Sequence, residues 1–268
     1  MSDFPLGRRN LRLGRNRPIA KGPRLSLKNY LLKSLPSPPA TVNYRGAAFR
    51  ALSQMYGNDS LGDCVIAGIA HLAGVFTANA GAPQLILTQA QIIALYGAIG
   101  GYVPGQPSTD QGCDEVTALN YWQQSGAPIG SHKIAGWLQV DAQNPTEYRT
   151  ALWLFENLMF GVELPDAWVN PFPSASNFTW DVAGPPNPNN GHCVVGVGYA
   201  PRGIVISTWG MAGVMTDAAV KYYAGNSQGG ALYAVLSADS INKAKAKAPS
   251  GFAWTQLVAD FDSIGGSV

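Results

Sequence analysis

Cysteine and charge are both scarce in this chain. Cys64, Cys113 and Cys193 are its three cysteines among 268 residues, and none of them belongs to a Cys-x-x-Cys pair. A small, odd number of thiols argues against a disulfide framework and favours a reducing compartment. Charged residues make up only 13% of the chain. With so few charges over its surface, we expect partners to cover part of it.

Long hydrophobic runs are absent as well. No stretch of about 18 uncharged apolar residues occurs, so the sequence predicts no membrane span and no membrane partner. The most apolar stretch, residues 65–80, contains His71 and is typical of a buried helix. Residues 1–10 lack the apolar core of a secretory signal. We therefore expect the protein in the cytoplasm or in a virion.

Positive charge is concentrated near the N-terminus. Residues 1–50 contain eleven lysines and arginines and one aspartate, whereas residues 51–268 contain seven basic and fifteen acidic residues. The basic residues of 1–35 lie among Gly, Pro and Asn, a composition that cannot order itself by burying apolar surface. We predict an extended arm that lies on protein, with other subunits of an assembly as its partners. Contact of the arm with nucleic acid is a second interpretation. The simplest interpretation is that the arm is a tail that only increases solubility.

The order of elements predicts an α+β fold. A basic arm with a short helix after Ser26 is expected over 1–38, a body over 39–240 and a C-terminal tail over 241–268. Apolar spacing predicts helices, then strands, in the body. The helices are expected over 64–80, 88–99, 115–124 and 145–158, and the strands over 159–164, 192–199, 203–208 and 231–236. A long proline-rich loop is expected over 170–190.

Two distant motifs could supply a nucleophile and its base. Residues 62–65 read Gly-Asp-Cys-Val and open the apolar helix, and residues 191–199 read as a buried strand that contains His192. A thiol at a helix N-terminus, joined by an imidazole from a distant strand, is a common Cys–His nucleophile, since the helix dipole favours the thiolate. The plain alternatives are an inert buried thiol and a satisfied core histidine.

Four motifs in order resemble those of the papain-like cysteine peptidases. Residues 42–45 (Val-Asn-Tyr-Arg) are similar to the Val-Asp-Trp-Arg of that family, and 62–64 (Gly-Asp-Cys) to its Gly-Ser-Cys. Residues 192–199 are similar to its His-Ala-Val-x-x-Val-Gly-Tyr, and 207–210 (Ser-Thr-Trp-Gly) to its Asn-Ser-Trp-Gly. The resemblance spans roughly residues 40–237. Within the family, the middle of the body resembles a divergent branch common in phages and prophages.

This resemblance implies a two-lobed domain, with a helical lobe carrying Cys64 and an antiparallel β lobe carrying His192. It makes Cys64 the nucleophile and His192 the general base and then the acid. Asn58 takes the position of the family's oxyanion-hole glutamine, with a side chain one methylene shorter. Ser207 takes the position of the asparagine that orients the histidine, and Trp209 would shield that contact.

We expect neither a cofactor nor a metal. The sequence contains no phosphate-binding loop. His192 and Cys193 are neighbours on a strand, so they point to opposite faces and cannot share a metal ion.

Two functions fit these observations. The first is a structural or accessory component of an assembly such as a phage particle, with or without a retained Cys–His site. Ser207 in the asparagine position and the low surface charge favour it. The alternative is a thiol hydrolase that cleaves peptide or amide bonds through an acyl-cysteine intermediate, which Cys64, His192 and Asn58 favour.

Overall fold

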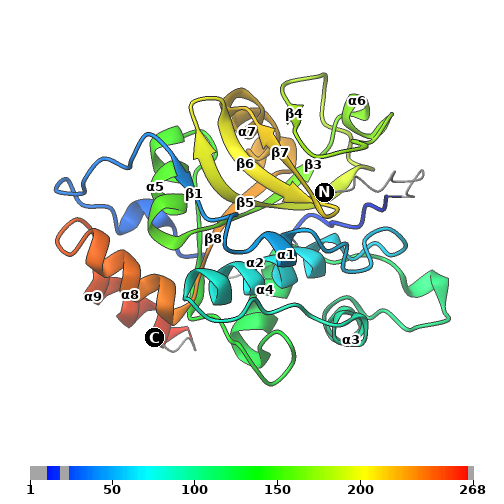
Figure 1. Ribbon diagram of the computed structural model, residues 1–268, viewed down its shortest axis with the longest axis horizontal. Coiled ribbons are helices and arrows are strands. Elements are labelled where there is room, and N and C mark those ends of the chain that lie inside the picture. Colours follow the sequence, from blue (N-terminus) through cyan, green and yellow to red (C-terminus); the bar gives the residue numbers. More distant parts are fainter. Residues whose placement is uncertain (1–10, 19–23, 265–268) are drawn as a thin grey trace.

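The computed structural model describes residues 11–18 and 24–264. The chain forms two lobes: one contains most of the strands together with several helices, and the other is mainly helical (Figure 1). The helices are α1 (Phe49–Leu52), α2 (Cys64–Asn79), α3 (Gln89–Gly100), α4 (Glu115–Ser125), α5 (Pro145–Phe155), α6 (Asp166–Val169), α7 (Asp217–Tyr223), α8 (Ala238–Lys247) and α9 (Trp254–Ser263). Short 3-10 turns occupy Leu27–Asn29, Pro107–Thr109 and Asn226–Gln228.

The strands join into one sheet that is antiparallel except for the pair β4 and β7. They are β1 (Val42–Asn43), β2 (Gly136–Gln139), β3 (Leu158–Glu163), β4 (Phe178–Trp180), β5 (Gly191–Ala200), β6 (Gly203–Thr208), β7 (Met211–Met215) and β8 (Ala231–Leu236). Their order is β2-β8-β3-β5-β6-β7-β4, and β1 pairs with β5. In the β3–β5 register Val162 faces His192, so this pairing fixes the position of the histidine.

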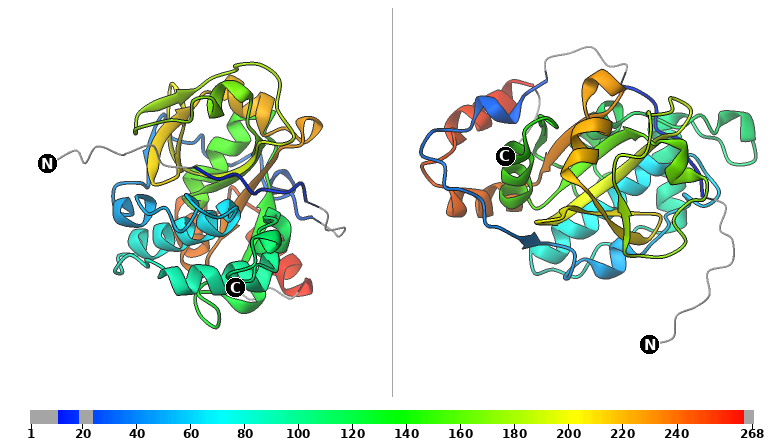
Figure 2. Two further views of the ribbon diagram at one scale, coloured as in Figure 1. Left: turned by 90° about the vertical axis from the view of Figure 1, so that its right-hand side faces the viewer. Right: turned by 90° about the horizontal axis from the view of Figure 1, so that it is seen from above.

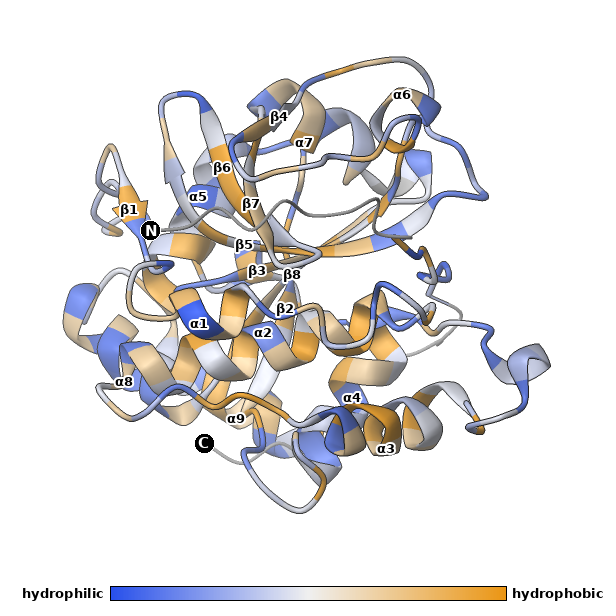
Figure 3. Cartoon of the chain, turned by 45° about the vertical axis from the view of Figure 1, so that its right-hand side comes forward, coloured by the Kyte–Doolittle hydropathy of each residue, from blue (hydrophilic) through white to orange (hydrophobic). Residues whose placement is uncertain are grey.

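β5 is central because its alternate side chains enter two different cores. Val194 packs in a core with α5, while Cys193 and Val195 pack in a second core with α2. A strand buried on both faces reads as a continuous apolar run, which is how residues 192–199 read. Apolar residues cover much of β5, β6 and α2 in Figure 3.

α2 is the predicted apolar helix, and it begins at Cys64 as expected. Its residues are buried without a break as far as Phe76, so the helix has almost no solvent face. Gly68 lets α2 approach β5 closely, because a Cβ at this position would lie 3.1 Å from Cys193 Sγ. This contact brings the first turn of α2 and the first residues of β5 to the same part of the molecule.

The segment after the basic arm differs from its prediction. A short helix was expected over 27–35, but only the 3-10 turn Leu27–Asn29 forms, and the Ser26 side chain does not cap it. The flanking backbone bonds to other segments instead: Gln139 N–H donates to Leu25 O, and Ala253 N–H donates to Tyr30 O. These long-range backbone bonds outweigh the helical spacing of the apolar residues.

The predicted C-terminal tail is packed on the body. α8 begins at Ala238, before the expected boundary, and packs against α5. Phe252 and Trp254 stack with ring centroids 4.2 Å apart, and both contact Phe155 of α5 edge to face. In the part of the chain that the structure describes, no helix is both long and apolar enough to cross a bilayer.

Candidate active site

Cys64 is the first residue of α2, directly after the N-cap residue Asp63. Its side chain is buried. Burial raises the pKa of the thiol to about 12, and the carboxylates of Asp63 and Glu115 add to the rise. The backbones of Cys193 and Gly14 lie close enough to act in the opposite direction. In this closed arrangement Cys64 is therefore a thiol rather than a thiolate.

His192 lies near the start of β5 and is fully buried. Its ring stacks on Trp209 with centroids 4.1 Å apart, and its Nε2 lies 2.6 Å from Thr208 Oγ1. Its other nitrogen, Nδ1, has no hydrogen-bond partner among the described residues. Burial lowers the pKa of the imidazole to about 3, so the ring is neutral at ordinary pH. A neutral ring with an unused nitrogen is the form that a general base requires.

The hydroxyl beside His192 belongs to Thr208, whereas the resemblance pointed to Ser207. Neighbouring residues of β6 point to opposite faces, so only one of them can reach the imidazole. Ser207 Oγ instead donates to the backbone carbonyls of Leu52 and Met211, at 3.1 and 3.3 Å. The structure thus brings Thr208 to His192 and leaves Ser207 as a link between β6 and its surroundings. A comparison of motifs by residue type alone cannot show that Thr208, rather than Ser207, faces the imidazole.

Asn58 lies in the loop before α2 and is buried. Its Nδ2 donates to Leu61 O at 3.0 Å, so one N–H of the amide holds the loop. Its backbone carbonyl accepts a hydrogen bond from Arg12 N–H. Burial also raises the pKa of the adjacent Asp63 well above its usual range. The side chain of Asn58 lies close enough to Asp63 to counteract part of this rise, and its role as an oxyanion donor stays a prediction.

Residues 11–17 of the basic arm lie over this site. Gly14 N–H and Arg15 N–H both donate to Gly191 O at 3.1 Å, next to His192. Cys113 N–H donates to Gly14 O, and Asn16 N–H donates to Cys113 O, which makes a parallel bridge. The arm thus binds as an extended chain, with backbone hydrogen bonds as well as contacts from its side chains.

The arm also contacts Trp209, which stacks on His192, and Gly62, which lies shortly before Cys64. Trp209 Nε1 donates to Arg12 O at 3.2 Å. A Cβ on Gly14 would overlap the carbonyl oxygen of Gly62, so the arm passes directly against the backbone before Cys64. In Figure 2 (left) this segment crosses the molecule between the strands above and the helices beneath. The burial of Cys64 and His192 is explained in part by the chain's own N-terminal segment.

The arm was expected on a protein surface, and its described part lies on the body of the same chain. Residues 1–10 and 19–23, which belong to the predicted arm, lie outside the described residues. Contact with other subunits or with nucleic acid through residues 1–35 stays a prediction. So do the catalytic roles of Cys64, His192, Asn58 and Ser207. No hydrogen bond joins the thiol of Cys64 to the imidazole of His192 within the described ranges.

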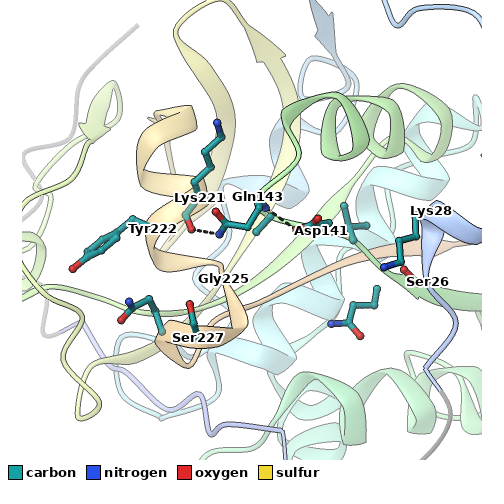
Figure 4. A pocket seen from close by; sticks show the side chains of 12 residues that line it. Ser26, Lys28, Asp141, Gln143, Lys221, Tyr222, Gly225 and Ser227 are labelled. Carbon is teal, nitrogen blue, oxygen red and sulfur yellow. Dashed lines mark hydrogen bonds between the residues drawn. The ribbon is translucent and has the colours of Figure 1, made fainter.

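A separate pocket lies beside the loop that precedes α5 (Figure 4). Gln143 organises it, because its Nε2 donates to Lys221 O at 2.7 Å and its backbone N–H donates to Asp141 Oδ1 at 2.8 Å. The pocket shares no lining residue with the Cys64 site. Over residues 11–18 and 24–264, no three His, Cys, Asp or Glu side chains are grouped so that they could hold a metal ion.

Comparison with known proteins identifies the fold. No family model and no curated protein matches the sequence. Xylellain, a cysteine protease from Xylella fastidiosa, superposes with a TM-score of 0.60 at 16% identity, over 87% of this chain and 98% of that one. Digestive procathepsin L2 from Tenebrio molitor larval midgut gives a TM-score of 0.54 at 13% identity, over 85% and 79%. The ragweed pollen cysteine protease Amb a 11, in its proform, gives 0.53 at 14%, over 76% and 67%.

The chain therefore has the fold of the papain-like cysteine proteases. The predicted fold class, an α+β domain with Cys64 on a helix and His192 on an antiparallel strand, is confirmed. At these identities the likeness concerns the fold alone, and the function has to be argued from the site.

Proposed function

We propose that this chain is a thiol hydrolase that cleaves peptide or amide bonds at Cys64, and that residues 11–17 hold its site closed. One observation carries the proposal. Residues 14–16 bind as an extended chain to Gly191 and Cys113, immediately beside Cys64 and His192. Backbone hydrogen bonds to an extended segment are a general mode of peptide recognition. The surface that the arm covers, between Gly191 and Cys113, is called the groove below, and its backbone groups are suited to an extended peptide substrate.

The chemistry follows from the positions of the groups once the arm leaves. Water then reaches Cys64, the desolvation that raises its pKa decreases, and His192 accepts the thiol proton. The sulfur attacks the substrate carbonyl carbon, and the oxyanion that forms is stabilised by backbone N–H groups at the start of α2 and by the amide of Asn58. His192 gives its proton to the leaving amine. A water molecule, deprotonated by His192, then attacks the acyl-cysteine, which releases the acid and restores the thiol.

Thr208 acts on this reaction through the imidazole. Its hydroxyl can accept a hydrogen bond from Nε2–H of His192, which leaves Nδ1 without a proton and free to act as the base. The stacked indole of Trp209 limits the rotation of the ring. Thr208 is therefore a positioning residue rather than a catalytic one.

The test of this proposal is to open the site and to measure hydrolysis. In Gly14→Val the added side chain overlaps the backbone of Gly62, so the arm lifts from the groove. We expect the variant to hydrolyse fluorogenic peptides from a mixed library faster than the unmodified chain. Gly46→Val is the matched control, because a Cβ at Gly46 meets nothing within 4 Å. No hydrolysis in Gly14→Val, or equal hydrolysis in Gly14→Val/Cys64→Ser, would refute the proposal.

A structural role in an assembly is the second candidate, and the closed site favours it. Cys64 and His192 are both buried, and all three thiols of the chain are buried in the described structure. The resemblance to a phage and prophage branch would place such a component in a virion or in an infected cytoplasm. The arm would then leave its own body to bind a neighbouring subunit. Analytical ultracentrifugation of the chain with and without residues 1–18 tests this role: a loss of self-association on truncation supports it, and an unchanged monomer refutes the arm as the link.

A further inference from the structure

The side chain of Arg15 fills a deep pocket beside the candidate active site. It is fully buried, as is the side chain of Glu115, the first residue of α4. Arg15 Nε donates to Glu115 Oε1 at 2.9 Å, and Nη1 donates to Gly229 O at 2.6 Å. Buried arginines need such pairing, because an isolated charge in a protein interior is very costly. The pocket therefore supplies both a charge and a directed acceptor for a guanidinium.

The wall of the pocket leaves room for this group. Gly161 of β3 forms it, and a Cβ at Gly161 would lie 2.7 Å from Arg15 Nε and Nη2 and would overlap Glu115 Oε1. Any larger residue at position 161 would therefore displace the guanidinium. Because Gly161 has no side chain, the pocket has room for the guanidinium. The carboxylate of Glu115 gives the pocket a negative charge.

The backbone of Arg15 occupies the place that a bound peptide would occupy. Its N–H donates to Gly191 O, beside His192, and the residue pairs with Cys113. Glu115 is also close enough to Cys64, Cys113 and Cys193 to raise the pKa of each thiol. A peptide held by these backbone groups would place a side chain in the pocket of Arg15.

We propose that this pocket selects an arginine side chain in the peptide that the groove binds, and that Glu115 determines this specificity. This proposal rests on the proposed function, because the bound peptide is a substrate only of a hydrolase. It names the substrate class: peptides with an arginine close to the bond that is cleaved.

The charge of Glu115 should make the pocket strongly prefer arginine over apolar side chains. Burial raises its pKa, and Arg15 counteracts that rise, so an empty or apolar-filled pocket leaves a buried carboxyl without its partner. Glu115 Oε2 and Arg15 Nη2 both lack hydrogen-bond partners among the residues that the structure describes. The guanidinium of a bound peptide that enters the pocket at another angle can bond to both Oε1 and Oε2 of Glu115 and form a bidentate pair. A lysine ammonium cannot match the planar fork and is expected to bind more weakly.

Binding can be tested without hydrolysis. The protein is the full chain with three substitutions: Gly14→Val lifts the arm, Arg15→Ala empties the pocket and Cys64→Ser disables the nucleophile. The probe is a fluorescent peptide with the sequence of residues 11–18, Leu-Arg-Leu-Gly-Arg-Asn-Arg-Pro, added in solution and followed by anisotropy. We expect replacement of its central arginine by norleucine to weaken binding by about tenfold or more, the range for a lost hydrogen bond to a charged group.

Two further substitutions assign the preference to the pocket. Adding Glu115→Gln should abolish the discrimination between arginine and norleucine, and adding Gly161→Ala should reduce it by crowding the guanidinium. Glu163→Gln is the matched control. Glu163 pairs with Arg17 of the same arm, whose side chain is 60% exposed, so its loss should leave the preference for arginine at position 15 intact. Circular dichroism verifies that each variant is folded.

Hydrolysis is measured in parallel with Gly14→Val and peptide substrates that differ only in arginine or norleucine. An arginine preference that disappears with Glu115→Gln supports the proposal. Hydrolysis without an arginine preference, or with a preference that Glu115→Gln leaves unchanged, overturns the proposal but not the proposed function. Absence of hydrolysis in all variants refutes the proposed function, and the anisotropy data then decide separately whether the pocket selects arginine.

Discussion

Trp209 stacks on His192 with an angle of 16° between the two rings. The same indole donates its N–H to the carbonyl of Arg12, in the segment that covers the site. One side chain therefore both orients the candidate base and holds the cover over it. Any movement of the arm that breaks the bond to Arg12 frees the edge of the indole, while its face can remain on the imidazole.

The reactivity of Cys64 should depend on the arm. In the unmodified chain burial raises the pKa of the thiol to about 12, so we expect very slow alkylation by iodoacetamide near pH 7. Gly14→Val should accelerate labelling of Cys64 well beyond that of Cys113 and Cys193. Peptide mass spectrometry measures all three rates in one experiment. Rapid labelling of Cys64 in the unmodified chain, or equal labelling of the three thiols in Gly14→Val, would contradict the prediction.

Removal of the Thr208 hydroxyl should affect stability and the pH profile of the site. Thr208→Val keeps the shape of the side chain but leaves Nε2 of His192 buried without its partner, at a cost of about 1–3 kcal/mol in the free energy of unfolding. In the Gly14→Val background we also expect a lower rate and a shifted pH–rate profile. Thr208→Ser retains the hydroxyl and should restore most of both. Urea unfolding and initial rates test the pair, and a pH profile unchanged in Thr208→Val would count against a positioning role.

Acid should destabilise the protein through two buried histidines. Burial lowers the pKa of His192 from 6.5 to about 3 and that of His71 to about 4. Below pH 6.5 the unfolded chain binds these protons and the folded chain does not. The contribution to stability is therefore complete above pH 6.5 and is lost as the pH falls, by about 1.4 kcal/mol per pH unit for each histidine.

His71→Asn tests this linkage away from the site. The variant has one fewer histidine that is buried in its neutral form, so its unfolding free energy should fall less steeply between pH 6 and 5. The difference in slope should be about one proton. Chemical unfolding at several pH values measures it, and parallel slopes for the variant and the unmodified chain would exclude His71 as a source.

The C-terminal helices should be necessary for stability. Phe252 is 3% exposed and lies between Tyr30, Phe155 and Trp254. Phe252→Ala should reduce the free energy of unfolding by about 3–5 kcal/mol, because it leaves a cavity where the N-terminal segment, α5 and α9 meet. Ile264→Ala, at a side chain that is 46% exposed, should have little effect. Equal losses for the two variants would mean that the C-terminal segment is not part of the folded body.

The sequence predicted the elements that carry the longest apolar patterns. α2, α4, β5, β6 and β8 lie within a few residues of their expected ranges, since each carries many buried apolar residues between clear boundary residues. The short edge strands β1 and β2 and the β4 strand inside the proline-rich loop escaped prediction. They depend on pairing with distant strands, which no local pattern reports. The short helix after Ser26 was wrong for the same reason.

In the candidate site, too, local patterns predicted some features, whereas features that depend on distant contacts escaped prediction. Motifs selected Cys64 and His192 as candidates, and they predicted that Cys64 begins a helix and that His192 lies on a buried strand. The catalytic roles of both residues stay predictions. The motifs could not reveal Thr208, since which of two adjacent hydroxyls faces the imidazole depends on the pleat of β6. Nor could they show Glu115, which is conspicuous only once Arg15, 100 positions away, is seen against it.

The backbone bonds of the arm end on loops and on the first residue of β5, outside the main ladder of the sheet. Release of residues 11–17 therefore breaks no pairing between the named strands, although it removes Leu11 and Leu13 from the edge of one core. Such an opening is a local fluctuation with its own free energy, smaller than that of global unfolding. Amide hydrogens of Gly14, Arg15 and Asn16 should consequently exchange with solvent much faster than those of β3 and β5. The ratio of each observed rate to the intrinsic rate of the same amide in an unstructured peptide would give the fraction of time that the arm is released.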